Sequence, residues 1–222
     1  MSDLWPWLAV FGLGAYHGVN PGMGWLFAVA LGLQEKSRRA IYKSLLPIAC
    51  GHAVSIGVII MLAWWAQAIL PSAVLRPLAA VALVAFGVYR LCRFRHPRWV
   101  GMRVGPRDLL LWSFLMASAH GAGLMLVPFL LGWSPAAHMP HAHHAESVSQ
   151  VFSPQAMAAL VGSRVGFMVV GVHTMGYLLV MGLVALVVYE KLGLALLRRA
   201  WFNLDWLWAA ALVAAGLLTQ FL

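Results

Sequence analysis

Apolar residues dominate six segments of the chain, and short polar segments separate them. The apolar segments cover residues 4–33, 43–66, 73–93, 108–132, 160–189 and 201–222. A helix needs about 20 mostly apolar residues to cross the hydrocarbon core of a bilayer, and each segment is long enough. The pattern therefore predicts an all-α integral membrane protein, with six transmembrane helices in one domain that covers residues 1–222.

The first apolar segment is interrupted near its middle by Tyr16-His17-Gly18-Val19-Asn20-Pro21-Gly22-Met23-Gly24. Proline lacks an N–H donor and clashes with the preceding turn, while glycine adds backbone freedom. We therefore expect the first helix to break at Pro21-Gly22. Broken helices at mid-membrane depth often mark the substrate site of a transporter. The alternative interpretation is a proline kink for packing, beside a hydrogen-bonded structural histidine.

The composition agrees with a membrane protein. The chain is 63% hydrophobic and 9% charged, with a mean hydropathy of +0.85, and it has no polar stretch long enough for a soluble domain. Its formal net charge is +9. Because the basic residues lie in short loops, we expect them to contact anionic membrane lipid and not nucleic acid.

Lysine and arginine are distributed unevenly among the loops. Thirteen of the fifteen lie in the loops after the first, third and fifth apolar segments, and Arg90 is counted here with the third loop. Cytoplasmic loops of membrane proteins carry this kind of excess. The distribution predicts that these three loops are cytoplasmic, and that both termini lie outside the cytoplasm in a protein of the cell (inner) membrane.

Each of four apolar segments contains one histidine near its middle. These residues are His17, His52, His120 and His173. The chain also divides into two similar halves, about 4–93 and 108–222, each with a His-Gly pair in its first segment and a histidine in its second. Because each half has three segments, an odd number, the second half would enter the membrane from the opposite side. We therefore expect two inverted three-helix repeats with the four histidines near one level.

Imidazole is costly in hydrocarbon, so the four histidines should face the bundle interior and a partner. They are the candidate metal ligands, and the alternative is four structural histidines bonded to nearby backbone. Further ligands, or residues that orient the rings, would be Asn20, Met23, Met125, Ser55, Thr174 and Tyr177. The apolar segments contain no central Asp or Glu, which argues against Mg²⁺ or Ca²⁺. Imidazole and thioether suit nickel, cobalt, zinc or copper, and imidazole can also carry protons.

The loop between the fourth and fifth segments, residues 133–155, is rich in histidine. It contains His138, His141, His143 and His144. Short His-rich tracts are typical of metal binding, and the charge distribution places this loop outside the cytoplasm. We expect it to capture or release metal ions.

The motif around His17 and Pro21, with His52 in the next helix, resembles the NicO-type nickel/cobalt efflux proteins of the wider LysE-like transporter group. The resemblance covers the first two apolar segments. It implies six helices in two three-helix repeats and a metal-efflux function. Asn20 stands where that family has an acidic residue and Met23 where it has a second histidine, and both changes neutralise or soften the site.

Taken together, these features predict a multi-pass transporter that moves a borderline or soft transition-metal ion through a midplane histidine site. Coupling to protons is an open possibility. Two other classes remain open. One is a redox protein with histidine-ligated haem, and the other is a membrane enzyme with a histidine-bound metal and water. The absence of a carboxylate within the apolar segments disfavours the enzyme, because the usual acid–base partner is missing.

Overall fold

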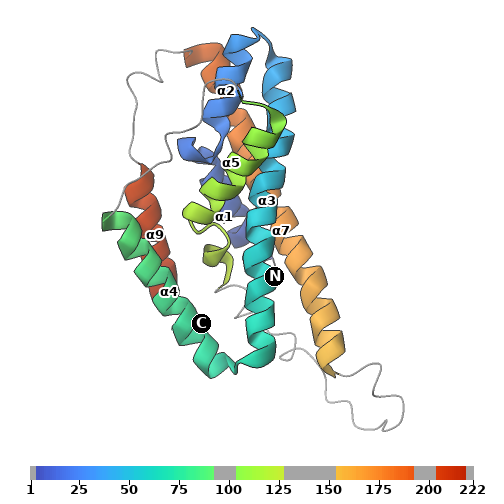
Figure 1. Ribbon diagram of the computed structural model, residues 1–222, viewed down its shortest axis with the longest axis vertical. Coiled ribbons are helices and arrows are strands. Elements are labelled where there is room, and N and C mark those ends of the chain that lie inside the picture. The colour runs from blue at the N-terminus through green and yellow to red at the C-terminus, as the bar shows by residue number, and fades with distance from the viewer. Residues whose placement is uncertain (1–3, 93–103, 128–153, 193–203, 219–222) are drawn as a thin grey trace.

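The computed structural model describes residues 4–92, 104–127, 154–192 and 204–218, and all regular structure in these ranges is helical. Figure 1 shows the arrangement of the helices. The α-helices are α1 (Trp5–Val19), α2 (Trp25–Gln34), α3 (Arg38–Ile69), α4 (Ser72–Cys92), α5 (Pro106–Ala119), α7 (Pro154–Val187) and α9 (Leu204–Leu218). Short helical turns are η1 (Pro21–Met23), η2 (Leu124–Leu126) and the π-helical η4 (Val188–Leu192).

Three helices are long and apolar enough to cross a membrane. Their apolar stretches are Arg38–Ala66, Ala73–Cys92 and Arg164–Lys191. Together they indicate a multi-pass membrane protein, as the hydropathy pattern predicts. In the described part of the chain the other helices are shorter, and α1 and α2 are short because the first apolar segment is divided between them.

Two long helices begin earlier than the apolar segments suggest. The helix α3 starts at Arg38, where the Ser37 side chain accepts a hydrogen bond from the Arg39 N–H. Its first turns therefore carry basic residues that the sequence pattern assigns to a loop. The helix α7 starts at Pro154. Apolar length measures the part of a helix that suits hydrocarbon, whereas capping residues decide where the helix begins.

The first apolar segment breaks at Pro21, as the sequence predicts. Asn20 adopts an extended backbone conformation, and its side-chain oxygen accepts a hydrogen bond of 2.9 Å from the Gly22 N–H. Gly24 follows with a φ of +130°, a conformation that favours glycine, and α2 then begins. The Trp25 indole N–H donates a 3.0 Å hydrogen bond to the Val19 carbonyl. This bond satisfies a carbonyl group that the break would otherwise leave unpaired inside the protein.

A second interruption follows α5. The helix ends at Ala119, Gly121 has a φ of +68°, and the 3₁₀ turn η2 begins at Leu124. Both interruptions therefore come within a few residues of a buried histidine, His17 in α1 and His120 at the end of α5.

The helices associate mainly as three pairs, α1 with α7, α3 with α5, and α4 with α9. Glycines allow the backbones of each pair to approach closely. A Cβ atom at Gly14 of α1 would lie 2.0 Å from the His173 carbonyl oxygen, and one at Gly51 of α3 would lie 2.1 Å from the Leu110 carbonyl oxygen. At Gly87 of α4 the distance to the Ala209 carbonyl oxygen would be 3.0 Å. Small residues commonly mediate close packing of this kind between membrane helices.

Two of the three pairs belong to one bundle, and the third pair lies beside it. The helix α3 also packs against α7, and α2 packs against both, so that α1, α2, α3, α5 and α7 form one bundle. Figure 1 shows α4 and α9 side by side along one flank of this bundle. Their buried side chains Leu83 and Leu212 belong to the same core cluster as Met23 and Tyr177 of the bundle.

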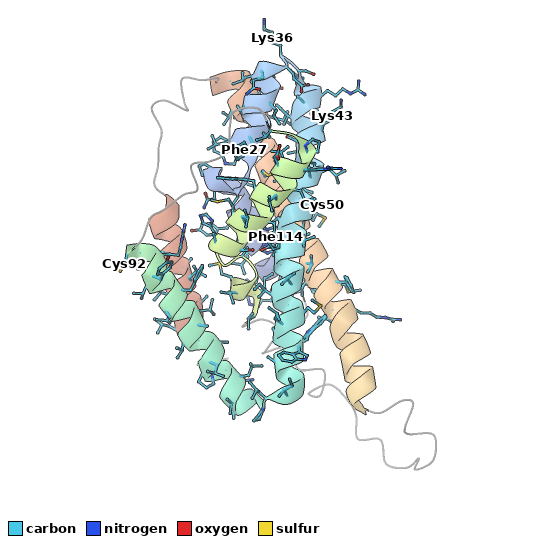
Figure 2. All side chains as sticks on the ribbon, viewed as in Figure 1. Phe27, Lys36, Lys43, Cys50, Cys92 and Phe114 are labelled. Atoms are coloured by element: carbon cyan, nitrogen blue, oxygen red, sulfur yellow. The ribbon has the colours of Figure 1, made fainter. Side chains whose placement is uncertain are left out.

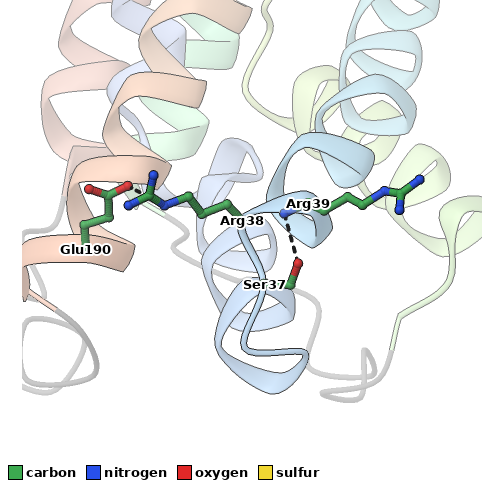
Figure 3. Close-up of polar contacts among 4 residues, drawn as sticks. All are labelled: Ser37, Arg38, Arg39 and Glu190. Atoms are coloured by element: carbon green, nitrogen blue, oxygen red, sulfur yellow. Dashed lines mark hydrogen bonds and ion pairs between the residues drawn. The ribbon is translucent and has the colours of Figure 1, made fainter.

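Basic residues gather at one end of the molecule, where Figure 2 shows Lys36 and Lys43. The Arg38 guanidinium forms a 2.9 Å ion pair with the Glu190 carboxylate (Figure 3). This contact places the α2–α3 turn and η4 at the same end. The residues around it line an open cavity of about 460 Å³, and none of them is one of the four central histidines.

Candidate functional site

Three of the four predicted histidines lie together in the centre of the bundle. The ring centroids of His17 and His173 are 4.9 Å apart, and those of His17 and His52 are 5.5 Å apart. His52 and His173 are also 5.5 Å apart, and their rings are nearly parallel. All three side chains are fully buried. We call these three residues the histidine triad, which joins α1, α3 and α7.

The orientation of the His17 ring is set by its own helix. Its Nδ1 lies 2.8 Å from the Leu13 carbonyl oxygen, one turn earlier in α1. A carbonyl oxygen can only accept, so Nδ1 carries the proton and Nε2 of the neutral ring carries a lone pair. Histidines that bind metals usually have this arrangement, in which the other ring nitrogen donates to a carbonyl or carboxylate oxygen.

The His52 ring lies against an aromatic side chain. The ring stacks on the Tyr177 ring at a centroid distance of 4.0 Å. The Tyr177 hydroxyl in turn donates a hydrogen bond to the Met23 carbonyl, directly before Gly24 in the broken segment. Among the residues that the structure describes, neither ring nitrogen of His52 has a hydrogen-bond partner. A buried polar atom without a partner is costly, so this imidazole is suited to a ligand.

His173 completes the triad from α7, and its ring lies close to those of His17 and His52. The close approach of Gly14 to the His173 backbone holds α7 against α1 at this level. Within the described ranges, no group of three or more His, Cys, Asp or Glu side chains has its donor atoms arranged to hold a metal ion in the observed rotamers. The triad is therefore a cluster of imidazoles in contact, and its nitrogens do not converge on one point.

His120 has a different environment from the triad. Its Nδ1 lies 2.8 Å from the Met116 carbonyl oxygen, and its Nε2 lies 3.3 Å from Nη2 of Arg90. Arginine can only donate and the carbonyl can only accept, so Nε2 accepts from Arg90 and Nδ1–H donates to Met116. The structure also corrects the sequence-based placement of Arg90 in a loop. Arg90 lies in the last turn of α4 and is only 7% exposed.

The other predicted site residues surround these histidines in different ways. Asn20 is buried and caps η1, and its side-chain nitrogen has no partner among the described residues. Ser55 shares a 2.8 Å hydrogen bond with Ser118 and so links α3 to α5. The buried Thr174 hydroxyl has no partner in the described part of the chain. Met23 and Met125 are buried in the same core cluster as Tyr177.

The predicted capture loop, with His138, His141, His143 and His144, lies outside the described residues. The sequence analysis assigned no role at the site to Arg90 or Ser118. Arg90 could have been noticed because it falls inside the apolar segment 73–93, where arginine is rare. No sequence signal indicates that Ser118 would face Ser55.

The chain matches no protein-family model, and no curated protein or solved structure is similar enough to count as a match.

Proposed function

We propose that this protein is a membrane transporter for a borderline or soft transition-metal ion, and that the histidine triad binds the ion during transport. The observation that carries this proposal is the contact of three fully buried imidazoles from three different helices. Imidazole nitrogens are common ligands of nickel, cobalt, zinc and copper. Hard cations such as Mg²⁺ require oxygen ligands, and no carboxylate belongs to the triad.

The break in the first segment gives the site a means to change shape. A single ion needs one nitrogen of each ring at about 2.0–2.1 Å. The parallel rings of His52 and His173 must therefore rotate before they can share an ion. Met23 lies within the broken segment, and its carbonyl holds Tyr177, on which His52 stacks. Movement at the break would thus be transmitted directly to a ligand.

We further propose that the helices form two inverted repeats, with the first three apolar segments equivalent to the last three. Exchanging the two halves converts the α1–α7 pair into the α5–α3 pair and leaves the α4–α9 pair unchanged, and all three pairs are present. His17 and His120 would be equivalent residues. Each has Nδ1 at 2.8 Å from the carbonyl oxygen four residues earlier. Each also precedes a 3₁₀ turn.

The expected orientation, with the basic loops in the cytoplasm, is part of the same proposal. The Arg38–Glu190 ion pair supports it, because it brings together the polar ends that follow the first and fifth segments. The positive-inside rule would place this end in the cytoplasm.

The test is metal binding by purified protein in detergent, followed by metal uptake into proteoliposomes. Protein equilibrated with Ni²⁺, Co²⁺, Zn²⁺ or Cu⁺ should retain about one ion per chain for at least one of these metals. His52→Ala should bind on the order of 100-fold more weakly, since loss of even an outer-shell partner costs 10–100-fold. Binding should also weaken at acidic pH because protons compete for the same nitrogens.

The matched control is His96→Ala, which removes a histidine that is neither in the triad nor in the His-rich tract. It should retain the metal content and uptake rate of the wild type. Equal metal content in the wild type and His52→Ala, or no bound metal in either, would contradict the proposal. A Soret band in the absorption spectrum of the purified protein would instead favour a haem protein.

A further inference from the structure

We propose that Arg90 determines how many imidazoles the substrate ion can engage, because it holds His120 out of the metal site. This role deepens the transport function proposed above and rests on it. The site would then have three imidazole ligands although four histidines lie in the centre of the protein.

The hydrogen bonds of His120 carry this inference. Both of its ring nitrogens are engaged, Nε2 with the Arg90 guanidinium and Nδ1 with the Met116 carbonyl oxygen. The lone pair that would bind a metal is on Nε2, the atom that accepts from Arg90. Hydrogen bonds from a charged donor are stronger than neutral ones, and a guanidinium inside a membrane protein requires polar partners. Arg90 therefore competes directly with a metal ion for His120.

His120 borders the broken segment that begins three residues after His17 of the triad. A Cβ atom at Gly22 would lie 3.8 Å from Cε1 of His120, so the ring is beside the break that follows His17. The Arg90 side chain comes from α4, which contributes no ligand. The difference between His17 and His120 therefore depends on a helix outside the triad.

The number of ligands affects how a transported ion is held. Four imidazoles complete the tetrahedral shell of a closed structural site, whereas three leave a position open. A transported ion must be bound well enough to enter and weakly enough to leave. By restricting the site to three imidazoles, Arg90 would allow an ion to be released.

The experiment counts imidazole nitrogens on bound Cu²⁺ by pulsed electron paramagnetic resonance. Wild-type protein should show three imidazoles. Arg90→Met removes the guanidinium that donates to Nε2 of His120, so this variant should show four imidazoles and bind Cu²⁺ about tenfold or more tightly. Arg90→Lys keeps a cationic donor and should still show three. Arg76→Met, on the same helix, is the matched control and should behave like the wild type.

Two further variants test the role of Arg90 even if the Arg90→Met protein does not fold. His120→Leu should retain three imidazoles and the wild-type affinity, whereas His52→Leu should lose one imidazole and most of the bound metal. The double variant Arg90→Met/His120→Leu should return to three. Four imidazoles in the wild type, or a loss of one in His120→Leu, would overturn the role of Arg90. Absence of bound metal in every protein would instead contradict the proposed transport function.

Discussion

His17 and His120 have the same local geometry but different neighbours. Each lies near the end of its helix and places Nδ1 at 2.8 Å from the carbonyl oxygen one turn earlier. The His17 ring contacts the rings of His52 and His173. The Nε2 of His120 instead lies 3.3 Å from the Arg90 guanidinium. Two histidines with the same backbone interaction can therefore have different chemistry.

The difference comes from the helices that pack around each histidine. At His17 the neighbour is α7, brought close by Gly14 and Gly18 of α1. At His120 a neighbouring contact comes from α4, which carries a buried arginine. In a low-dielectric interior, a hydrogen bond such as the one from this guanidinium is electrostatically stronger than in water. Three substitutions test whether helix packing maintains the difference, beginning with the one of largest expected effect.

The largest effect is expected from Gly14→Ala, which prevents the close approach of α1 to α7. The new Cβ atom would lie 2.0 Å from the His173 carbonyl oxygen, so the helices must separate. Overpacking of this kind costs about 1–3 kcal/mol and sometimes more. We expect a lower unfolding temperature and loss of metal from the triad. Unchanged metal content would mean that the triad does not depend on this contact.

Gly12→Ala is the matched control for Gly14→Ala because it makes the same chemical change on the same helix. A Cβ atom at Gly12 meets nothing within 4 Å. Alanine is the better helix former, so this variant should be as stable as the wild type or slightly more stable. A comparable loss of stability in both variants would show that the effect comes from α1 itself and not from its contact with α7.

Tyr177→Phe should have an intermediate effect, restricted to the triad. It keeps the aromatic ring that stacks on His52 but removes the hydroxyl that donates to the Met23 carbonyl. A buried carbonyl left without its partner costs about 1–3 kcal/mol. We expect a lower thermal unfolding temperature and weaker metal binding, measured by titration. Tyr42→Phe, at an exposed position on α3, should change neither quantity.

The smallest effect is expected from Ser55→Ala, which removes the hydrogen bond between the Ser55 side chain of α3 and the Ser118 side chain of α5. Ser118 keeps its own hydrogen bond to the Phe114 carbonyl, so no partner is left unsatisfied. The cost should lie at the lower end of the usual range, about 0.5 kcal/mol. Ser44→Ala removes only a local bond to Ile41 and serves as the control on the same helix. A large loss of metal from Ser55→Ala alone would show that Ser55 supports the triad more directly.

The sequence by itself determined the membrane character of the protein, the break at Pro21, and the presence of histidines inside several apolar segments. Each of these depends on residues close together in the chain. Proline breaks a helix wherever it occurs in the interior, and apolar length predicts a membrane helix without knowledge of its neighbours. The rise of 1.5 Å per residue also gives an expected depth in the membrane for each histidine.

The tertiary structure alone decided which histidines meet. The depth of a residue in the membrane does not specify which way its side chain points around the helix, or which helix lies opposite. His17, His52 and His173 meet because α1, α3 and α7 pack together, with glycines where the backbones of α1 and α7 approach closely. His120 Nε2 instead accepts a hydrogen bond from Arg90, thirty residues earlier in the chain. That bond depends on how α4 packs near the end of α5, and helix packing of this kind is a property of the folded bundle.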